Sequence, residues 1–279
     1  MVNIQQQALI KACDKLGIKW EFIDKYKIAL KIYTKPVRFM LFSINPFLDF
    51  TTSKILKDKD FTHQLVQDVV KMPRFKSYLN PNINPKYEEY KKFDSVAEII
   101  VDIEKSFSYP VIIKKNKGSA GSFVFYCSNK PDIENALSNI YNRKSRKYDY
   151  IALAEEFVEI KKEYRVVTIK NKVDFLYLKD NNGAEFTGNV SPLHYDGARA
   201  VLVEDLDLQN RIEQFIKPVF DLIDLPMAGF DIAEDMSGNL YLIEINGSPS
   251  MKIFARDNGI EKVNTFYEKL LIQNIHLVI

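Results

Sequence analysis

Residues 227–250 read MAGFDIAEDMSGNLYLIEINGSPS, and this stretch decides the fold. Two runs with strand character, 228–233 and 240–245, flank residues 235–239, which are of the types that form tight turns. The stretch therefore predicts an antiparallel β-hairpin whose turn is centred between Ser237 and Gly238. Equal counting outward from that centre places Asp231 opposite Glu244.

Three side chains with oxygen donors converge in this predicted hairpin. Because side chains alternate along a strand, Asn246 falls on the same face as Glu244. Two carboxylates that face each other repel, and a hard divalent cation compensates for this with geometry suited to oxygen, so Mg²⁺ is the predicted ion. The alternative interpretation is a surface hairpin with solvated acids. Against that alternative, Leu242 lies beside Glu244 and the other face is apolar, which indicates a strand buried on both sides.

The composition is that of an ordinary globular protein. The 279 residues are 46% hydrophobic and 27% charged, which allows a sizeable core in one large domain or in two or three lobes. A formal net charge of +2 gives no large field to attract nucleic acid. We interpret the one local basic run as a solvated loop; it contains Arg143, Lys144, Arg146 and Lys147.

The cysteines and the apolar runs indicate the compartment. With only Cys13 and Cys127, neither a disulfide framework nor a thiolate zinc site is indicated. The first 15 residues lack the apolar core of a signal peptide, and the most apolar run, 39–50, is too short and too polar to span a bilayer. We therefore expect a cytoplasmic protein with neither a membrane nor a nucleic-acid partner.

The first 50 residues predict a small α/β module. Asn3 can cap a helix that Gly17 ends, and three short strands follow at 19–23, 28–33 and 37–42. This module is smaller than a typical independent domain, so it is expected to dock on the rest of the chain.

A helix within 53–70 follows, with Lys59 at its start and Pro73 beyond its end. A cation at a helix N-terminus is mildly unfavourable; this is tolerable for a solvated lysine and is also expected where an anion binds. The apolar stripe of the helix consists of Phe61, Leu65, Val66, Val69 and Val70.

A strand, a glycine loop and a second strand are predicted at 111–126. Gly118 and Gly121 stand among small residues whose backbone N–H groups can approach a phosphate, and Lys114 adds charge at the edge of the loop. The loop is not a Walker P-loop, because residues 123–126 continue as a strand and do not open a helix. The unit is either a flap that covers phosphates or an ordinary hairpin.

A linker between two lobes is predicted after the strand at 151–154. Glu155 and Glu156 end this strand and Glu163 opens the next. Acids at the mouth of such a cleft can bond sugar hydroxyls or the amino group of a base, or they simply coat a loop. The polar stretch 179–199 suits a binding loop or disorder, and it contains Lys179, Asn189, His194 and Arg199.

The order of these features resembles the ATP-grasp superfamily of carboxylate-amine ligases, which includes glutathione synthetase, cyanophycin synthetase, D-alanine:D-alanine ligase and ribosomal-protein glutamate ligases. The likeness covers residues 53–254. It is strongest in the hairpin, where the 13-residue step from Asp231 to Glu244 and the two-residue step to Asn246 match the family's magnesium ligands. KDKDFTHQLV resembles the first phosphate-contacting helix, and PVIIKKNKGSAGSFVF resembles the flap. The chain departs from the family at Lys115, where proline is frequent, and at Phe123, where a further glycine is common.

The resemblance implies an α+β ATP-grasp fold, in which two α+β lobes clasp ATP after a short N-terminal α/β module at 1–50. The ATP-grasp domain would span 51–279, with a flap lobe at 93–155 and a metal-binding lobe at 156–279. Asp231, Glu244 and Asn246 would hold Mg²⁺, with Mn²⁺ as the alternative ion. Lys179 and Arg199 would balance charge near the transferred phosphate. The other implied ATP contacts are Lys59 and Lys114 at the phosphates, Ser119, Ala120, Gly121 and Ser122 in the flap, Glu155, Glu156 and Val158 at adenine, Glu163 at ribose, and Asn189 in the loop before the metal site.

The implied activity is ATP-dependent ligation. ATP would phosphorylate a substrate carboxylate, and the amine of an amino acid or peptide would attack the acyl phosphate to give an amide. Two alternatives stay open: a catalytically silent ATP-binding regulatory or scaffold protein, and a grasp-type phosphotransferase. The sequence identifies neither the acid nor the amine, and a homo-oligomer is one possible quaternary state.

Overall fold

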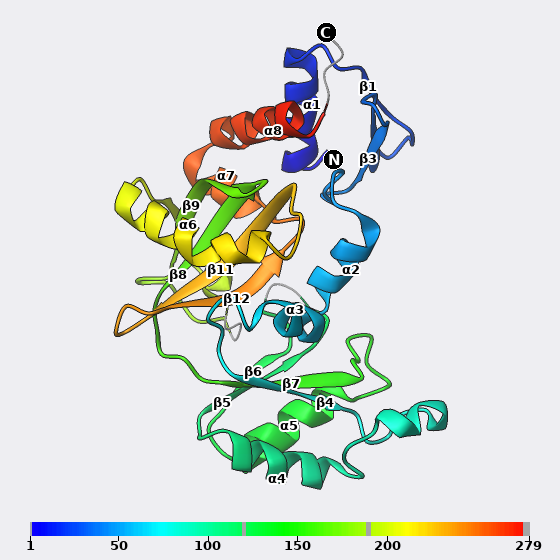
Figure 1. Ribbon diagram of the computed structural model, residues 1–279, viewed down its shortest axis with the longest axis vertical. Coiled ribbons are helices and arrows are strands. Elements are labelled where there is room, and N and C mark those ends of the chain that lie inside the picture. The colour runs from blue at the N-terminus through cyan, green and yellow to red at the C-terminus, as the bar shows by residue number, and fades with distance from the viewer. Residues whose placement is uncertain (1, 119–120, 188–190, 276–279) are drawn as a thin grey trace.

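The computed structural model describes residues 2–118, 121–187 and 191–275, which form three antiparallel sheets and their helices (Figure 1). The sheets follow one another along the long axis of the molecule: a three-stranded sheet beside α1, a five-stranded sheet in the middle and a four-stranded sheet at the far end (Figure 1). This is the α+β mixture that the sequence predicts. Among the described residues, no helix combines the length and the apolar character needed to cross a membrane.

The N-terminal module has the predicted order of one helix and three strands. Asn3 caps the helix through a capping box that it shares with Gln6. The strands lie within the predicted ranges and are one residue shorter at each end. The elements are α1 (Ile4–Lys15), β1 (Trp20–Phe22), β2 (Ala29–Ile32) and β3 (Arg38–Leu41).

The module is docked on the C-terminal part of the chain, as predicted. Apolar side chains of α1, β2 and β3 share one core with those of α8 (Glu261–Asn274). Gln5, although polar, is buried in this interface, and its Nε2 donates a hydrogen bond of 3.1 Å to the Pro249 carbonyl. The module therefore contacts the segment that directly follows the acidic hairpin.

Two helices replace the single helix predicted within 53–70. They are α2 (Phe50–Lys57) and α3 (Lys59–Val66), and they meet at Asp58, whose extended backbone interrupts the helix. The Asp58 carboxylate accepts a hydrogen bond of 3.1 Å from the Phe61 N–H, so this residue caps a new helix. The apolar period alone did not reveal the cap. Of the predicted stripe, Val66 and Val70 are buried, whereas Phe61, Leu65 and Val69 are exposed.

The four-stranded sheet has the order β4-β7-β5-β6. Two helices pack on one face of it and share a core with its inward side chains (Figure 1). The other face is turned toward α3 and the five-stranded sheet (Figure 1). The elements are β4 (Phe75–Leu79), the 3₁₀ helix η1 (Pro85–Tyr90), α4 (Val96–Ser106), β5 (Val111–Lys115), β6 (Val124–Cys127), α5 (Lys130–Ile140) and β7 (Ile151–Glu156).

The five-stranded sheet has the order β10-β9-β8-β11-β12. The linker predicted after residue 154 is present, since the chain passes from the four-stranded sheet at Glu156 to the five-stranded sheet at Ile160. The elements are β8 (Ile160–Ile169), β9 (Lys172–Asp180), η2 (Pro192–His194), β10 (Arg199–Leu202), α6 (Leu206–Phe220), β11 (Met227–Asp235), β12 (Leu240–Asn246) and α7 (Lys252–Asn258), followed by α8.

The β11–β12 hairpin confirms that Asp231 lies opposite Glu244, but the centre of the turn and the pairing next to it differ from the prediction. Next to the turn, Glu234 pairs with Leu240 and Ala233 with Tyr241, so the turn is centred on Ser237. The register then shifts by one residue, because Ile232 pairs with Leu242 while Asp231 pairs with Glu244. Ile243 is therefore the extra residue of a β-bulge.

The bulge changes which side chains of β12 share a face. Leu240, Leu242 and Ile245 are buried in the core beneath α6. Ile243 and Glu244 both line the pocket on the other side of the strand. The prediction that Leu242 lies beside Glu244 on one face is therefore wrong. A regular strand would alternate through this region, and the bulge moves Glu244 to the face opposite Leu242.

One face of the five-stranded sheet is divided into an apolar and a charged part. Along β8, side chains two residues apart share this face; Val167 and Ile169 join the core beneath α7 and α8, whereas Glu163 and Arg165 form ion pairs. The neighbouring strands show the same division of this face into an apolar and a charged part. The charged side chains therefore lie together at the end of the sheet that faces α3 and the four-stranded sheet.

Candidate functional site

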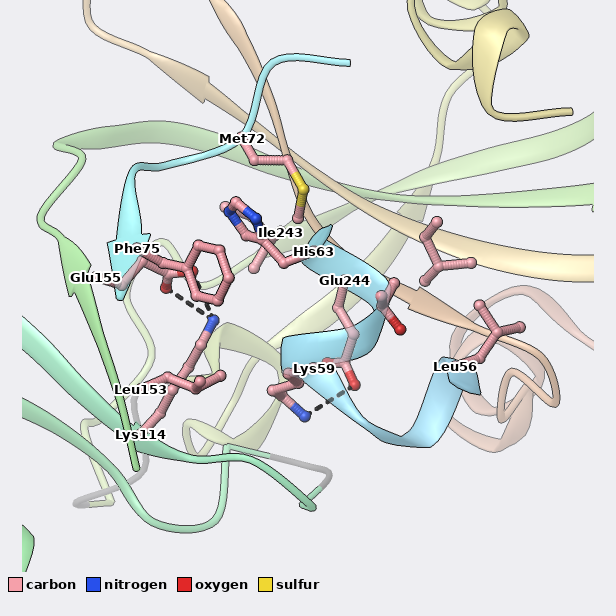
Figure 2. Close-up of a pocket in the computed structure, with 12 residues that line it drawn as sticks. Leu56, Lys59, His63, Met72, Phe75, Lys114, Leu153, Glu155, Ile243 and Glu244 are labelled. Atoms are coloured by element: carbon pink, nitrogen blue, oxygen red, sulfur yellow. Dashed lines mark hydrogen bonds and ion pairs between the residues drawn. The ribbon is translucent and has the colours of Figure 1, made fainter. Parts of the chain in front are cut away.

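A small pocket lies between the two larger sheets (Figure 2). The four-stranded sheet contributes side chains from β4, β5 and β7, α2 and α3 cover one side, and β12 contributes the bulge and its neighbours. The cavity volume is about 20 Å³, enough for a single water molecule. Its lining residues are Leu56, Lys59, Thr62, His63, Met72, Phe75, Lys114, Leu153, Glu155, Ile243, Glu244 and Ile245.

A buried ion pair occupies the wall formed by the four-stranded sheet. Lys114 Nζ lies 2.7 Å and 2.8 Å from the two carboxylate oxygens of Glu155. Lys114 comes from β5 and Glu155 from the adjacent β7, and only 8% and 9% of the two side chains is exposed. Such a pair is stable only while both partners are present, because either charge alone would be buried without compensation.

A second ion pair joins α3 to the hairpin. Lys59 Nζ lies 3.3 Å from Glu244 Oε1, as Figure 2 shows, and it also donates a 2.7 Å hydrogen bond to the Gly118 carbonyl. The Asn116 side chain accepts a 2.9 Å hydrogen bond from the Asp60 N–H at the start of the same helix. The lysine thus holds the acidic strand and the base of the predicted flap at one point.

A third charged cluster surrounds Asp231. Arg165 Nε lies 2.5 Å and Lys179 Nζ 2.9 Å from Asp231 Oδ1, and Lys179 also binds Glu163. Burial alone would raise the pKa of Asp231, but the charges of Arg165 and then Lys179 outweigh burial and hold this pKa below its usual value. Burial would lower the pKa of Lys179, and the charges of Asp231 and Glu163 raise it. Asp231 and Lys179 are therefore both held in their charged forms.

These pairs correct one step of the sequence argument. The two facing carboxylates do need compensation, but the protein supplies it itself, from Arg165 and Lys179 at Asp231 and from Lys59 at Glu244. Repulsion between the acids therefore does not by itself require a metal ion.

The donor set nevertheless fits magnesium. Among the described residues, no three Asp, Glu, His or Cys side chains converge on one point, so a site built from the protein alone is absent there. Mg²⁺ typically takes one or two carboxylates and completes its shell with phosphate oxygens and water, which suits Asp231 and Glu244. Asn246 adds an amide whose Nδ2 is buried without a hydrogen-bond partner in the structure as described. The unpaired Nδ2 does not itself bind a cation; a metal ligand would be Oδ1, to which no described residue donates a hydrogen bond.

The remaining residues that the resemblance singles out lie in several places. Glu156 ends β7 and is held by Arg74 through a 2.7 Å ion pair, and Val158 is half-buried in the linker that follows. Gly121 and Ser122 lie in the turn before β6. Arg199 is exposed at the first position of β10, where its backbone lies opposite Asp180 in the strand register. Its side chain is not part of the charged cluster around Asp231. Ser119, Ala120 and Asn189 lie outside the described residues.

Sequence reasoning missed several residues that line or support the pocket. His63 stacks on Phe75 with ring centroids 3.5 Å apart, and its Nε2 lies 3.1 Å from the Pro73 carbonyl oxygen. Its position on α3 four residues after Lys59 was a usable signal, since such residues share a helix face. Ile243 enters the pocket only because of the bulge. Arg165 supports the site from β8, where it binds Asp231.

A family match covers most of the chain. Residues 78–270 match the sequence model of a family described as the RimK-like ATP-grasp domain. The match includes the Lys114–Glu155 pair, the Asp231 cluster and the whole hairpin, and it begins after α3.

Two curated relatives show how far the similarity extends. The chain is 24% identical over 190 residues to the uncharacterized protein MG012 of Mycoplasma genitalium, which covers 68% of this chain and 60% of that protein. It is 26% identical over 163 residues to the α-aminoadipate–LysW ligase LysX of Sulfurisphaera tokodaii, which covers 58% of this chain and 54% of that ligase. The match thus spans little more than half the length of these relatives.

Solved structures share the architecture. The D-alanine–D-alanine ligase of Bacillus anthracis superposes with a TM-score of 0.54 at 16% identity, over 83% of this chain and 68% of that one. At this identity the similarity shows the fold alone, which is the ATP-grasp fold.

Proposed function

Because the chain belongs to the RimK-like ATP-grasp family, whose members include ATP-dependent ligases that form C–N bonds, we propose that it uses ATP to join a substrate carboxylate to an amine. The amine or the acid belongs to an amino acid, a peptide or a carrier protein. LysX, by its name, joins α-aminoadipate to LysW, which supports a protein-borne acceptor. The division into a module at 1–50 and an ATP-grasp domain at 51–279 is part of this proposal.

The reaction proceeds in two balanced steps. A carboxylate oxygen of the substrate bonds to the γ-phosphorus of ATP while the bond to the ADP oxygen breaks. The amine nitrogen then bonds to the carbonyl carbon of the acyl phosphate, inorganic phosphate leaves, and the nitrogen loses a proton. No protein nucleophile takes part, so the side chains act by positioning and by balancing charge.

The observation that supports the proposal best is the bulged hairpin beside α3. The hairpin brings Glu244 next to Asp231, and Lys59 meets Glu244 at the pocket. Asp231, Glu244 and Asn246 would hold the magnesium ion, which when bound supplies Lewis-acid stabilisation of the phosphate oxygens. Lys59 and Lys114 bind the phosphates. Lys179 balances charge near the γ-phosphate from its buried position.

The cavity must enlarge for ATP to enter. A nucleotide needs several hundred Å³, and the present cavity measures about 20 Å³. The side chains that close it include ion pairs between neighbouring elements, so we expect the ATP phosphates to take the place of Glu244 at Lys59 and to join Glu155 at Lys114. Glu163 and Val158, together with Glu156, contact the nucleoside, and Gly121 and Ser122 cover the phosphates with Ser119 and Ala120. Arg199 and Asn189 approach from the loop 181–198 and its ends.

The experiment that tests the proposal measures ADP release in the presence of Mg²⁺, ATP and mixtures of carboxylates and amines, with mass detection of the product. Glu244→Gln should reduce turnover by about a hundredfold or more while ATP binding weakens less. Glu268→Gln is a matched control, because Glu268 pairs with Lys15 at the surface, away from the pocket. ADP release that never depends on any pair of carboxylate and amine contradicts a ligase.

The same assay distinguishes the proposed ligase from two alternatives. A silent nucleotide-binding scaffold would bind ATP without releasing ADP under any substrate mixture. A phosphotransferase would release ADP with a single acceptor and leave a stable phosphorylated product. The buried charged groups around Asp231 favour the ligase, because a scaffold without turnover needs no such costly arrangement of charges.

A further inference from the structure

The N-terminal module exposes a row of large apolar side chains along β3. Phe39 is 55% exposed and Leu41 45% exposed, on the sheet face away from α1. Val37 just before the strand and Phe42 just after it are exposed as well. Single exposed apolar residues need no explanation, but a contiguous row on one strand marks a contact surface.

The same strand has a partly open hydrogen-bonding edge, in which the Leu41 carbonyl already accepts a 3.0 Å hydrogen bond from the Ile44 N–H. The sheet order is β1-β2-β3, so within the described residues β3 pairs with β2 alone. The Phe42 N–H bonds the Ile28 carbonyl across this pair. Because backbone groups alternate in direction along an antiparallel strand, Phe39 and Leu41 turn their N–H groups to the outer side. An extended segment can therefore add to this edge as a fourth strand.

The charge of the module favours an acidic partner. Residues 1–50 contain eight Lys and Arg against four Asp and Glu, a net charge of +4, whereas the whole chain carries only +2. All four acids keep their charge and bond to groups of their own module or of α2, and the excess of basic residues keeps the module net positive. These acids are Asp14, bound to Trp20 Nε1; Glu21, to Tyr33 and Lys31; Asp24, to backbone N–H groups; and Asp49, to the Thr52 N–H.

We propose that the outer edge of β3 binds an extended acidic peptide segment by strand addition. Apolar side chains of the segment pack on Phe39 and Leu41. Its acidic side chains meet the basic surroundings of the strand, where Arg38 is the residue between Val37 and Phe39. That this segment belongs to the ligase substrate rests on the proposed function, whereas the binding itself does not.

Two other occupants fit less well. A second copy of the module would bring one net positive surface against another, which is unfavourable. An anionic membrane would match the charge and the apolar row, but it would leave the outward N–H groups of Phe39 and Leu41 without partners in hydrocarbon. A peptide strand satisfies the charge, the apolar row and the open edge together.

The test uses the full chain and a fluorescein-labelled ten-residue peptide of alternating Glu and Val. Anisotropy should report binding that Phe39→Glu weakens by about tenfold or more. Leu206→Glu is the matched control, since Leu206 is also an exposed apolar residue but begins α6 outside the module, and it should leave binding unchanged. A peptide of alternating Lys and Val should not bind. Hydrogen exchange should slow at the Phe39 and Leu41 amides when the acidic peptide is present.

Three outcomes overturn the proposal. The first is no binding of the acidic peptide, or equal binding by the Phe39→Glu variant with its circular dichroism spectrum unchanged. The second is sedimentation of the wild-type chain as a dimer that Phe39→Glu dissociates. The third is binding to phosphatidylserine vesicles that Phe39→Glu abolishes while peptide binding is unaffected. Phe39→Glu should retain ATP binding and Glu244→Gln should retain peptide binding, so failure at the edge and failure of the proposed ligase are distinguished.

Discussion

Lys179 Nζ lies 2.9 Å from Asp231 Oδ1, with 4% and 7% of the two side chains exposed. The carboxylate that we propose as a metal ligand is thus already compensated by cations on neighbouring strands. This compensation makes the two acids of the hairpin unequal. Asp231 is tied to the fold, whereas the ion pair of Glu244 with Lys59 is partly exposed, with 24% and 16% of the two side chains accessible.

We therefore expect different effects from removing each acid. Asp231→Asn leaves Arg165 and Lys179 buried near one another with less compensation, and should lower the free energy of unfolding by about 3–5 kcal/mol. Glu244→Gln loses only the pair with Lys59 and should cost less than about 1 kcal/mol. Urea unfolding without ATP measures both. Equal stability losses for the two variants would contradict the inequality.

The Lys114–Glu155 pair should behave as one unit. Lys114→Met alone leaves Glu155 buried and unpaired, with an expected loss of about 3–5 kcal/mol. Lys114→Met combined with Glu155→Leu removes both charges and should recover most of this loss while nucleotide affinity stays low. A double-mutant cycle in urea, together with a nucleotide titration, checks both parts. Additive losses in the cycle would show that the two residues do not interact.

Two glycines next to the metal-ligand positions should differ in their tolerance of a methyl group. A Cβ on Gly229 would lie 2.6 Å from Pro249 Cβ and 3.2 Å from Arg165 Cδ, and the proline ring cannot turn away. Gly229→Ala should therefore cost about 1–3 kcal/mol. A Cβ on Gly247 would meet Leu48 Cδ2 at 2.5 Å, the end of a flexible side chain, so Gly247→Ala should cost less. Thermal unfolding ranks the two variants.

Stability should fall in mild acid because of His63. Burial lowers its pKa below 6.5, partly offset by its bond to the Pro73 carbonyl. The unfolded chain then binds a proton near pH 6.5 that the folded chain does not, so the free energy of unfolding decreases as pH falls below 6.5. The slope contributed by one group is at most about 1.4 kcal/mol per pH unit.

Urea midpoints at several pH values between 5 and 7.5 test this expectation. His63→Leu should flatten the pH dependence even if it lowers stability overall. His194→Gln is the control, since His194 is exposed in η2 and should leave the slope as it is in the wild type. An unchanged slope in His63→Leu would assign the acid sensitivity to other groups.

Local signals in the sequence were enough for most of the elements. The turn residues around Ser237 and the cap at Asn3 each act within a few residues, so they predict the hairpin and the first helix. The match of spacing between Asp231 and Glu244 to a known family identified the fold. Local signals were misread at Asp58, where a cap residue stood inside an apolar period.

The ion-pair partners could not be predicted, because they depend on how strands distant in sequence align. Arg165 meets Asp231 through the β8–β11 register, and Lys179 reaches it from β9, one strand further across the sheet. The Ile243 bulge has no local marker either. It follows from the need to bury Leu242 and Ile245 in the same core while Glu244 faces the pocket.

The Ile243 bulge also divides β12 into two halves that should tolerate substitution by different rules. On the turn side, Leu240 and Leu242 should tolerate replacements according to their size and apolarity. The effect of these replacements should be a change in the abundance of folded protein. Beyond the bulge, replacements at Glu244 and Asn246 should leave abundance nearly unchanged and alter only nucleotide-dependent behaviour. Ile245 lies beyond the bulge but belongs to the core, so in a saturation scan of these seven positions it should behave like Leu240 and Leu242 and interrupt the second class.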